Sequence, residues 1–318
     1  MAEIKNVLVL FEMDEDRRKS LEEILPSADY SYMDRKDLKD EDLEKADVIL
    51  GSLSPSKVRN LKKLQWMQLS SAGSDLFQKE GFPEQAILTN ATGGYGPAIS
   101  EHMIGMLFML VRKLHLYRDN QSNELWQSEG DVLQVAGSTA LVIGMGDIGT
   151  EFAKRMKAMG SYVIGVRRSN TKKSEYADEI HLIDDLDELI KRADIISLSV
   201  PETEDTKQIL SKERIGLLKE NAIIINVGRG TAIDTEALCD ALYENKIWGA
   251  GLDVTDPEPL PEGHRLWKAK NLVLTPHVSG GYSLKSTYNR ILDICINNYK
   301  AFVNGEEMKN VVDFKRGY

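Results

Sequence analysis

The sequence contains few cysteines, fewer basic than acidic residues and no long apolar run. Its two cysteines, Cys239 and Cys295, fall in predicted helices among apolar neighbours and lack metal-ligand spacing, so we expect buried thiols in a reducing compartment and no metal site. With 40 basic against 50 acidic residues, the net charge of −10 argues against nucleic acid as a partner. The apolar run 103–111 covers about half a membrane span, and the run 7–11 is too short for a signal sequence. These absences predict a cytoplasmic protein without a membrane segment.

The rest of the composition is that of an ordinary globular protein, with 42% hydrophobic and 28% charged residues over 318 positions. This length suggests two domains, each large enough for its own core. Short apolar runs alternate with helical patterns, which is typical of doubly wound α/β folds with parallel sheets. The glycine-rich stretch 90–97 is interpreted as a linker after a first domain of residues 1–97, with Tyr95 facing the cleft.

This alternation predicts individual elements. The expected strands are 7–11, 30–33, 48–50, 67–69, 86–89, 141–143, 162–166, 195–200, 222–227, 249–254 and 272–274. The expected helices are 16–25, 38–45, 56–61, 98–117, 147–159, 186–192, 212–218, 236–244 and 284–302. The pattern 98–117 is apolar on nearly all sides between 103 and 111, so we expect burial all round, by its own domain or by another subunit. The polar segment around Trp126 is expected to form a surface arm.

The most informative stretch is Gly144-Met145-Gly146-Asp147-Ile148-Gly149, which lies between an apolar run and a helical pattern. In such a turn Gly144 permits the tight bend, Gly146 lets a pyrophosphate approach the backbone, and Gly149 lets helix and strand pack closely. The helix N-terminus then offers unpaired N–H groups to the phosphates. We interpret the motif as dinucleotide-binding, and the alternative is a plain tight connection.

The end of the next strand indicates which dinucleotide is bound. NAD-type sites place a carboxylate about 20 residues after the glycines, where it accepts hydrogen bonds from the adenosine ribose. Here Arg167, Arg168 and Ser169 occupy that place. Two guanidinium groups and a hydroxyl suit a 2′-phosphate, so NADP is favoured over NAD. The alternative is a pair of solvated arginines on a loop.

Several other features follow predicted strands of the second unit, at the edge where open α/β sheets bind ligands. They are Val200-Pro201 with Thr203 and Thr206, Asn226-Val227-Gly228-Arg229-Gly230, the loop from Asp253 to Pro259, and Thr275-Pro276-His277 with the residues to Gly281. Each is ambiguous alone, because loop histidines and carboxylates are mostly solvated. Together they predict one crevice beside a cofactor.

These side chains match the requirements of 2-oxo acid reduction. Arg229 can hold carboxylate and carbonyl oxygens in its fork. His277 is the natural proton donor, because imidazole titrates near neutrality. Glu258, hydrogen-bonded to the ring, orients it and favours its protonated form. A nicotinamide cofactor supplies the hydride.

Two further segments have competing interpretations. The loop 70–75 follows a strand, so its N–H groups either form a nest for a carboxylate or belong to a helix N-cap and turn. Ser100-Glu101-His102 looks like a catalytic pair, but a Glu and a His adjacent on a helix do not face each other. We therefore do not assign Glu101 and His102 to catalysis.

The order and spacing of these motifs resemble the D-isomer-specific 2-hydroxyacid dehydrogenases over essentially the whole chain. The motifs are the glycine motif, Val200-Pro201 with Thr203 and Thr206, and the segments 226–234, 253–261 and 275–277. The resemblance implies Arg229 as substrate-binding arginine, Glu258 as partner of the histidine and His277 as general acid/base. It also implies that amides of Ala72, Gly73 and Ser74 hold the substrate carboxylate, and that Asp253 lies near the nicotinamide carboxamide. Tyr95, expected to face the cleft, is also assigned to substrate binding. The residues assigned to the cofactor are thus the six of the glycine motif, Arg167, Arg168, Ser169, Val200, Pro201, Thr206, Val227, Gly228, Asp253 and His277.

The same resemblance implies a flavodoxin-like substrate domain, completed by residues 286–318, and a Rossmann cofactor domain of residues 98–285. It also implies a homodimer formed through the cofactor domains. We expect an NADPH-linked reductase of a small 2-oxo acid such as glyoxylate or hydroxypyruvate, which gives a D-2-hydroxy acid. The alternatives are oxidation of formate or phosphite, as in relatives of the family, and a non-catalytic dinucleotide-sensing protein of the same fold. Trp126 and Tyr282 are weighed as further pocket residues.

Overall fold

The computed structural model describes residues 3–281 and 284–315, which leaves Tyr282 outside the described residues. The chain divides into two compact units, one of Met1–Tyr95 with Tyr282–Tyr318 and one of Gly96–Gly281. The expected boundaries, 97/98 and 285/286, lie a few residues beyond these divisions. Each unit contains one parallel sheet, so the predicted doubly wound α/β class is confirmed.

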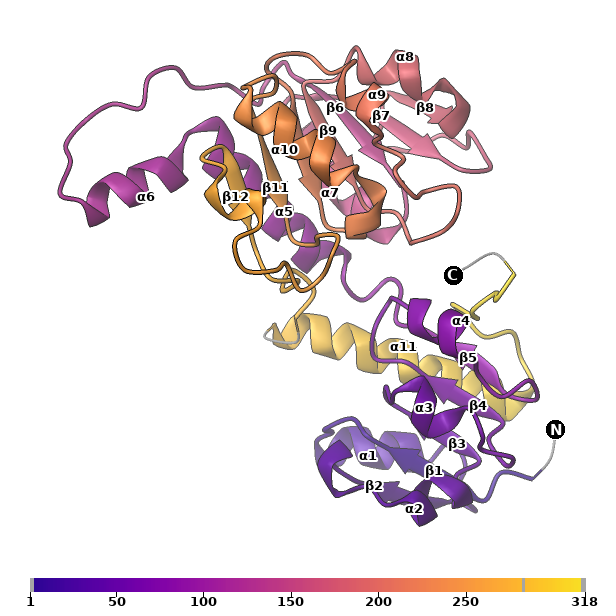
Figure 1. The fold of residues 1–318 in the computed structure, drawn as a ribbon. Helices are drawn as coiled ribbons and strands as arrows, with labels where there is room; N and C mark the ends of the chain where they lie inside the picture. The colour runs from indigo at the N-terminus through magenta and orange to yellow at the C-terminus, as the bar shows by residue number, and fades with distance from the viewer. Residues whose placement is uncertain (1–2, 282–283, 316–318) are drawn as a thin grey trace. The chain divides into compact units, whose positions relative to one another are not determined.

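The first unit is built on a five-stranded sheet with the order β2-β1-β3-β4-β5 (Figure 1). Its strands are β1 (Asn6–Val9), β2 (Asp29–Tyr32), β3 (Val48–Leu50), β4 (Trp66–Gln68) and β5 (Ile87–Thr89). Its helices are α1 (Glu15–Glu22), α2 (Asp40–Lys45), α3 (Pro55–Val58), α4 (Asp75–Glu80) and α11 (Lys285–Asn304), with the 3₁₀ turn η1 (Arg35–Asp37). All its strand pairs are parallel, so their carboxyl ends share one edge.

The last helix, α11, is fixed to this sheet by directional contacts. Trp66 on β4 is fully buried and stacks on Tyr299, with ring centroids 6.1 Å apart. The hydroxyl groups of Tyr299 and Tyr30 lie 2.9 Å apart. Asn298 Nδ2 donates to Gln68 Oε1 at 2.9 Å inside the core. These contacts specify where a helix from the end of the chain joins strands formed more than 200 residues earlier.

The second unit is built on a seven-stranded sheet with the order β12-β11-β10-β9-β6-β7-β8 (Figure 1). Its strands are β6 (Thr139–Ile143), β7 (Tyr162–Arg167), β8 (Glu179–Leu182), β9 (Ile195–Leu198), β10 (Ile223–Asn226), β11 (Gly249–Leu252) and β12 (Leu272–Leu274). Its helices are α5 (Gly96–Val111), α6 (Leu114–Ser122), α7 (Asp147–Ala158), α8 (Leu186–Ile190), α9 (Lys212–Ile215) and α10 (Thr235–Tyr243), with the 3₁₀ turns η2 (Ile183–Asp185), η3 (Gly230–Ala232) and η4 (Arg265–Lys268).

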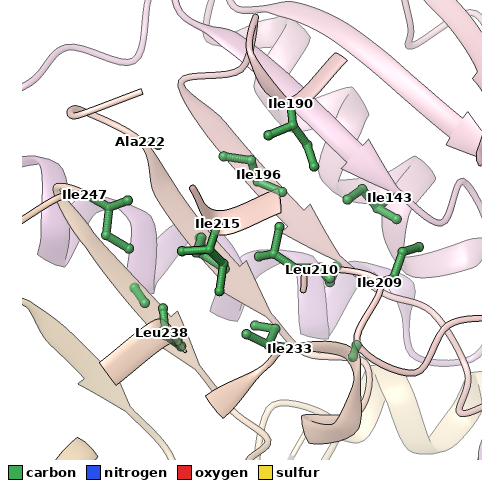
Figure 2. Close-up of a cluster of buried hydrophobic side chains, with 14 of the residues drawn as sticks. Ile143, Ile190, Ile196, Ile209, Leu210, Ile215, Ala222, Ile233, Leu238 and Ile247 are labelled. Atoms are coloured by element: carbon green, nitrogen blue, oxygen red, sulfur yellow. The ribbon is translucent and has the colours of Figure 1, made fainter. Parts of the chain in front are cut away.

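The core on one face of this sheet is almost purely aliphatic. Four side chains are buried together there: Ile196 of β9, Ile215 of α9, Leu238 of α10, and Leu210 before α9 (Figure 2). Because the inner strands are buried, their sequences are continuous runs of such branched apolar residues. Both cysteines, Cys239 here and Cys295 in the first unit, are buried free thiols, as predicted. Burial raises the pKa of each thiol.

Two expectations about elements were wrong. The helix expected over 98–117 is two helices, because Lys113 adopts a left-handed conformation with φ of +55° between α5 and α6. The indole N–H of Trp248 donates to the Leu110 carbonyl at the end of α5, at 3.0 Å. Phe108 on α5 is 38% exposed in the single chain, so burial of this helix on all sides stays a prediction that involves another subunit. The edge strand β8 was missed because its sequence is half polar.

The segment after α6 is exposed, and Trp126 has a fully exposed side chain, as expected of a surface arm. Among the described residues, no helix combines the length and the hydrophobicity needed to cross a bilayer.

Candidate active site

The glycine turn joins β6 to α7 and provides a cradle for phosphate. A Cβ at Gly149 would lie 1.9 Å from the carbonyl oxygen of Gly144, so only glycine allows the helix to begin this close to the strand. Gly146 is the N-cap of α7, makes no side-chain cap hydrogen bond and faces open space. The first N–H groups of a helix have no partner within the helix. The turn therefore fits a dinucleotide pyrophosphate.

Two other residues of the motif have structural contacts. The carboxylate of Asp147 accepts a hydrogen bond from the Gly96 N–H at 2.7 Å, which ties the start of α7 to the start of α5. Met145 is buried, and the position of a Cβ on Gly165 would lie 2.7 Å from its Cγ. Ile148 is half-buried on α7. The motif thus presents backbone, rather than these side chains, to a ligand.

At the end of β7, Arg167 Nη1 donates to Asn170 Oδ1 at 3.0 Å. Its Nε is buried and has no hydrogen-bond partner, and Arg167 forms no ion pair within the described residues. Arg168 and Ser169 follow on an exposed segment. A guanidinium without a carboxylate partner is suited to an anionic ligand, and no acid stands at the end of this strand.

The loops after β9 and β10 approach each other closely. A Cβ on Gly228 would lie 2.7 Å from the Val200 carbonyl oxygen, and both Val200 and Val227 are largely buried. The hydroxyl of Thr206 donates to the Pro201 carbonyl at 2.6 Å and accepts from the Thr203 N–H. Thr206 therefore shapes the 201–206 turn, and its hydroxyl is already engaged.

Arg229 is placed by the residue that ends β10. The amide side chain of Asn226 donates to the Arg229 carbonyl at 2.9 Å and accepts from the Gly228 N–H at 3.0 Å. The next residue, Gly230, lies so close to the Thr255 carbonyl that a Cβ would be 2.0 Å from it. This approach brings the arginine loop against the loop that carries Glu258.

His277 and Glu258 form the hydrogen-bonded contact that the family resemblance implied. His277 Nδ1 lies 2.6 Å from Glu258 Oε1, across 19 residues of sequence. A carboxylate can only accept, so Nδ1 carries the proton and Nε2 is the nitrogen left for a reactant. Both side chains are about half exposed, at 50% and 41%. The pair is therefore formed and accessible within the second unit.

Asp253 has an enclosed carboxylate, and its place near the nicotinamide carboxamide stays a prediction. It is 1% exposed, and its carboxylate accepts four hydrogen bonds from the Thr275 hydroxyl, the Val278 N–H and both the N–H and the hydroxyl of Ser279. Its carboxylate is thus saturated by the loop around His277. Neither the sequence nor the resemblance indicated this role.

In the first unit, the 70–75 loop follows β4, and Ser74 is the N-cap of the short helix α4. Ser71 Oγ donates to the Gly73 carbonyl at 3.0 Å. Tyr95 is 6% exposed, and its hydroxyl donates to the Ser70 carbonyl, while its expected place at a cleft stays a prediction. Because burial removes its ring from solvent, Tyr95 supports the base of this loop.

The sequence analysis named Asn226 and Thr275 within motifs but gave them no role, and it set His102 aside, whereas all three contact the loops of the candidate site. Asn226 was visible as a polar residue at the end of an apolar strand, whereas the contact of His102 joins residues 173 positions apart. Within the described residues, no three His, Cys, Asp or Glu side chains gather as metal ligands.

The arrangement defines an α/β protein with a glycine turn that fits a dinucleotide and a hydrogen-bonded His–Glu pair at the carboxyl edge of one sheet. Residues 104–279 match the family model of the D-isomer specific 2-hydroxyacid dehydrogenase NAD binding domain. Glycerate dehydrogenase of Methylorubrum extorquens is 31% identical over 286 residues, which cover 86% of this chain and 87% of that protein. Glyoxylate reductase of Korarchaeum cryptofilum is 35% identical over 243 residues, which cover 74% and 71%.

A solved structure of a D-isomer specific 2-hydroxyacid dehydrogenase family protein from Aeromonas salmonicida is also similar, with a TM-score of 0.84, 31% identity and coverage of 98% of this chain and 100% of that one. The chain belongs to the D-isomer specific 2-hydroxyacid dehydrogenases, so the predicted family is confirmed. It is an oxidoreductase with a domain for a nicotinamide dinucleotide.

Proposed function

We propose that the protein reduces a small 2-oxo acid, such as glyoxylate or hydroxypyruvate, to the D-2-hydroxy acid with NADPH. The observation that carries this proposal is the 2.6 Å contact between His277 Nδ1 and Glu258 Oε1, which leaves Nε2 as the proton-donating atom. The relatives named glycerate dehydrogenase and glyoxylate reductase support a short substrate.

The proton is delivered by His277. In its imidazolium form the ring donates through Nδ1 to Glu258 and holds the reacting proton on Nε2. Transfer of that proton to the substrate carbonyl oxygen leaves a neutral ring with its Nδ1–H still on Glu258, so its orientation is kept through the step. The Glu258 carboxylate accepts the Nδ1–H in both states. In the reverse direction the same nitrogen accepts the hydroxyl proton.

Arg229 binds the substrate carboxylate and polarises its carbonyl. Its charge is permanent and its fork matches two oxygens. The Asn226 amide sets the backbone from which the side chain extends. The amides of Ala72, Gly73 and Ser74 are further candidate donors to the substrate carboxylate, and the Tyr95 hydroxyl contacts the start of their loop at Ser70.

The cofactor is held by the turn 144–149 and by the loops of Val200, Pro201, Val227 and Gly228, whose backbones approach closely. When bound, NADPH supplies a hydride to the carbonyl carbon. Arg167, with Arg168 and Ser169, binds the 2′-phosphate, because β7 ends in cations and a hydroxyl instead of an acid.

We also propose a cytoplasmic homodimer formed through the cofactor units. Exposed apolar side chains on α5, α6 and the following segment support the dimer. They are Phe108, Leu114, Leu125, Trp126 and Val132, with exposures from 38% to 104%. Large exposed apolar side chains in one region are typical of interfaces. Light scattering tests this assembly, and a monomer at micromolar concentration contradicts it.

The function is tested by a panel of 2-oxo acids with NADPH and with NADH, followed at 340 nm, and by the oxidised cofactors with formate and phosphite. We expect turnover of a short 2-oxo acid and a higher kcat/KM for NADPH. Turnover of formate or phosphite alone contradicts the substrate class. Cofactor binding without any turnover supports a sensing role instead. A preference for NADH contradicts the assignment of Arg167 to the 2′-phosphate of NADPH.

A further inference from the structure

The loop that carries His277 is fixed by hydrogen bonds to one buried residue, Asp253. Asp253 Oδ1 accepts from Thr275 Oγ1 at 2.6 Å and from the Val278 N–H at 2.9 Å. Its Oδ2 accepts from the N–H and the hydroxyl of Ser279. The Asp253 carbonyl accepts the N–H of His277 itself at 2.8 Å. One residue thus fixes the loop on both sides of the histidine.

This support is needed because His277 has an unfavourable backbone conformation. Its φ is +53°, in the left-handed region that non-glycine residues seldom occupy. Such conformations persist only where the surroundings hold them. Any group that strengthens the Asp253 contacts therefore also fixes the direction of the imidazole.

His102 is such a group. It lies on α5, and its Nε2 is 3.0 Å from Thr275 Oγ1 and 3.9 Å from Asp253 Oδ1. The single hydroxyl proton of Thr275 is donated to Asp253, so its oxygen must accept from His102. His102 Nε2 therefore carries a proton. The result is a directed chain from His102 through Thr275 to Asp253.

The neighbouring acid does not share this contact. Glu101 Oε1 pairs with Arg155 at 3.3 Å, whereas the His102 side chain is only 26% exposed and reaches the loop after β12. Adjacent residues on a helix point in different directions. The Glu101-His102 sequence is thus two separate contacts.

We propose that His102 is a positioning residue for the reaction: through Thr275 and Asp253 it fixes the loop from which His277 transfers its proton. This inference rests on the proposed function. His102 does not touch the reactants in this role, so its loss affects proton transfer rather than the binding of cofactor.

The kinetic test compares His102→Leu, which removes the donor, with His102→Gln, which keeps an N–H at similar reach. We expect roughly a tenfold lower kcat for His102→Leu, because small displacements of a reacting group cost rate. KM and the Kd for NADPH should change less than about twofold, and His102→Gln should recover most of the rate. Thr275→Val should give the same loss, with no further loss when combined with His102→Leu.

The control is His181→Leu, which removes a histidine that contacts Glu179 at 2.7 Å on the edge strand β8 of the same unit. We expect its kcat to equal that of the wild type. A His102→Leu variant with wild-type kcat, or equal losses in the Leu and Gln variants, overturns the inference.

A second measurement does not depend on activity. Since the chain has five histidines, ¹⁵N-detected spectra of the imidazoles can be assigned with single His→Gln variants. We expect His102 Nε2 to be protonated, and a bare Nε2 overturns the inference even if a variant misfolds. A wild-type protein that reduces no 2-oxo acid overturns the proposed function and this role together. An active wild type with an unaffected His102→Leu variant overturns only the positioning role.

Discussion

In the seven-stranded unit the core beside the sheet is aliphatic, and the polar side chains gather at the carboxyl edge. In the five-stranded unit, aromatic rings and a buried amide contact join the sheet to α11. The first core is formed by one continuous stretch of chain, whereas the second receives a helix from the far end of the sequence. Aliphatic packing tolerates substitution, whereas stacked rings and buried hydrogen bonds have one good geometry. Directional contacts therefore occur where a distant segment has to be specified.

The largest expected effect is on catalysis, and it should leave the stability of both cores unchanged. Replacing His277 with Ala removes the proposed proton donor, so kcat should fall by about 10²–10⁴-fold. His277 is half exposed, so the melting temperature and the Kd for NADPH should stay close to the wild-type values. Steady-state kinetics and fluorescence titration measure these quantities. Unchanged turnover would refute the acid/base role.

Trp66→Ala should break the aromatic contact of the five-stranded unit. The side chain is fully buried and stacks on Tyr299, so we expect a loss of about 3–5 kcal/mol in the free energy of unfolding. The matched control is Trp267→Ala, whose side chain is 55% exposed and should cost far less. Denaturant unfolding compares the two variants. Equal losses in the two variants would contradict a contribution of the Trp66–Tyr299 stacking to the free energy of unfolding.

Arg167→Asp tests the binding edge of the seven-stranded unit. We expect the ratio of kcat/KM for NADPH to that for NADH to fall more than tenfold, since a charged hydrogen bond contributes about 1.5–3 kcal/mol. Lys172→Asp, a charge reversal on the exposed segment after β7, is the control and should change the ratio less. A ratio unaffected by Arg167→Asp would remove the 2′-phosphate assignment.

Asn298→Ala tests whether buried hydrogen bonds specify α11. The change removes the donor to Gln68 Oε1 inside the core, so we expect about 1–3 kcal/mol of destabilisation. Asn304→Ala, at the exposed end of the same helix, should stay within about 0.5 kcal/mol of the wild type. Thermal and urea unfolding measure both. A neutral Asn298→Ala would contradict the comparison between the two cores.

The smallest effect concerns the edge strand β8. Hydrogen bonds from Arg192, His181 and Tyr162 lower the pKa of Glu179 to about 2 from an ordinary 4.5. The stabilisation is therefore present above pH 4.5 and is lost as the pH falls towards 2. Because the site is near the surface, Glu179→Gln should cost less than about 1 kcal/mol at neutral pH, and the difference should vanish in acid. A difference that persists at low pH would contradict this linkage.

Much of the fold could be predicted because each inner strand is an apolar run and each connection is a helical pattern. The failures have local causes. The break at Lys113 has no proline or glycine to indicate it, and β8 is an edge strand whose residues are half polar. The hydrogen bond from the Tyr95 hydroxyl to the Ser70 carbonyl was not predicted, because it joins residues 25 positions apart.

The candidate site divides in the same way. The sequence by itself determined the glycine turn, the cation-rich end of β7 and the order in which Arg229, Glu258 and His277 follow their strands, because these depend on local residue types and spacing. Only the tertiary structure decided that Asp253 is enclosed by the loop of His277 and that His102 reaches it through Thr275. Hydrogen bonds across more than 170 residues leave no periodic signal, since their geometry exists only after the sheet and α5 have packed.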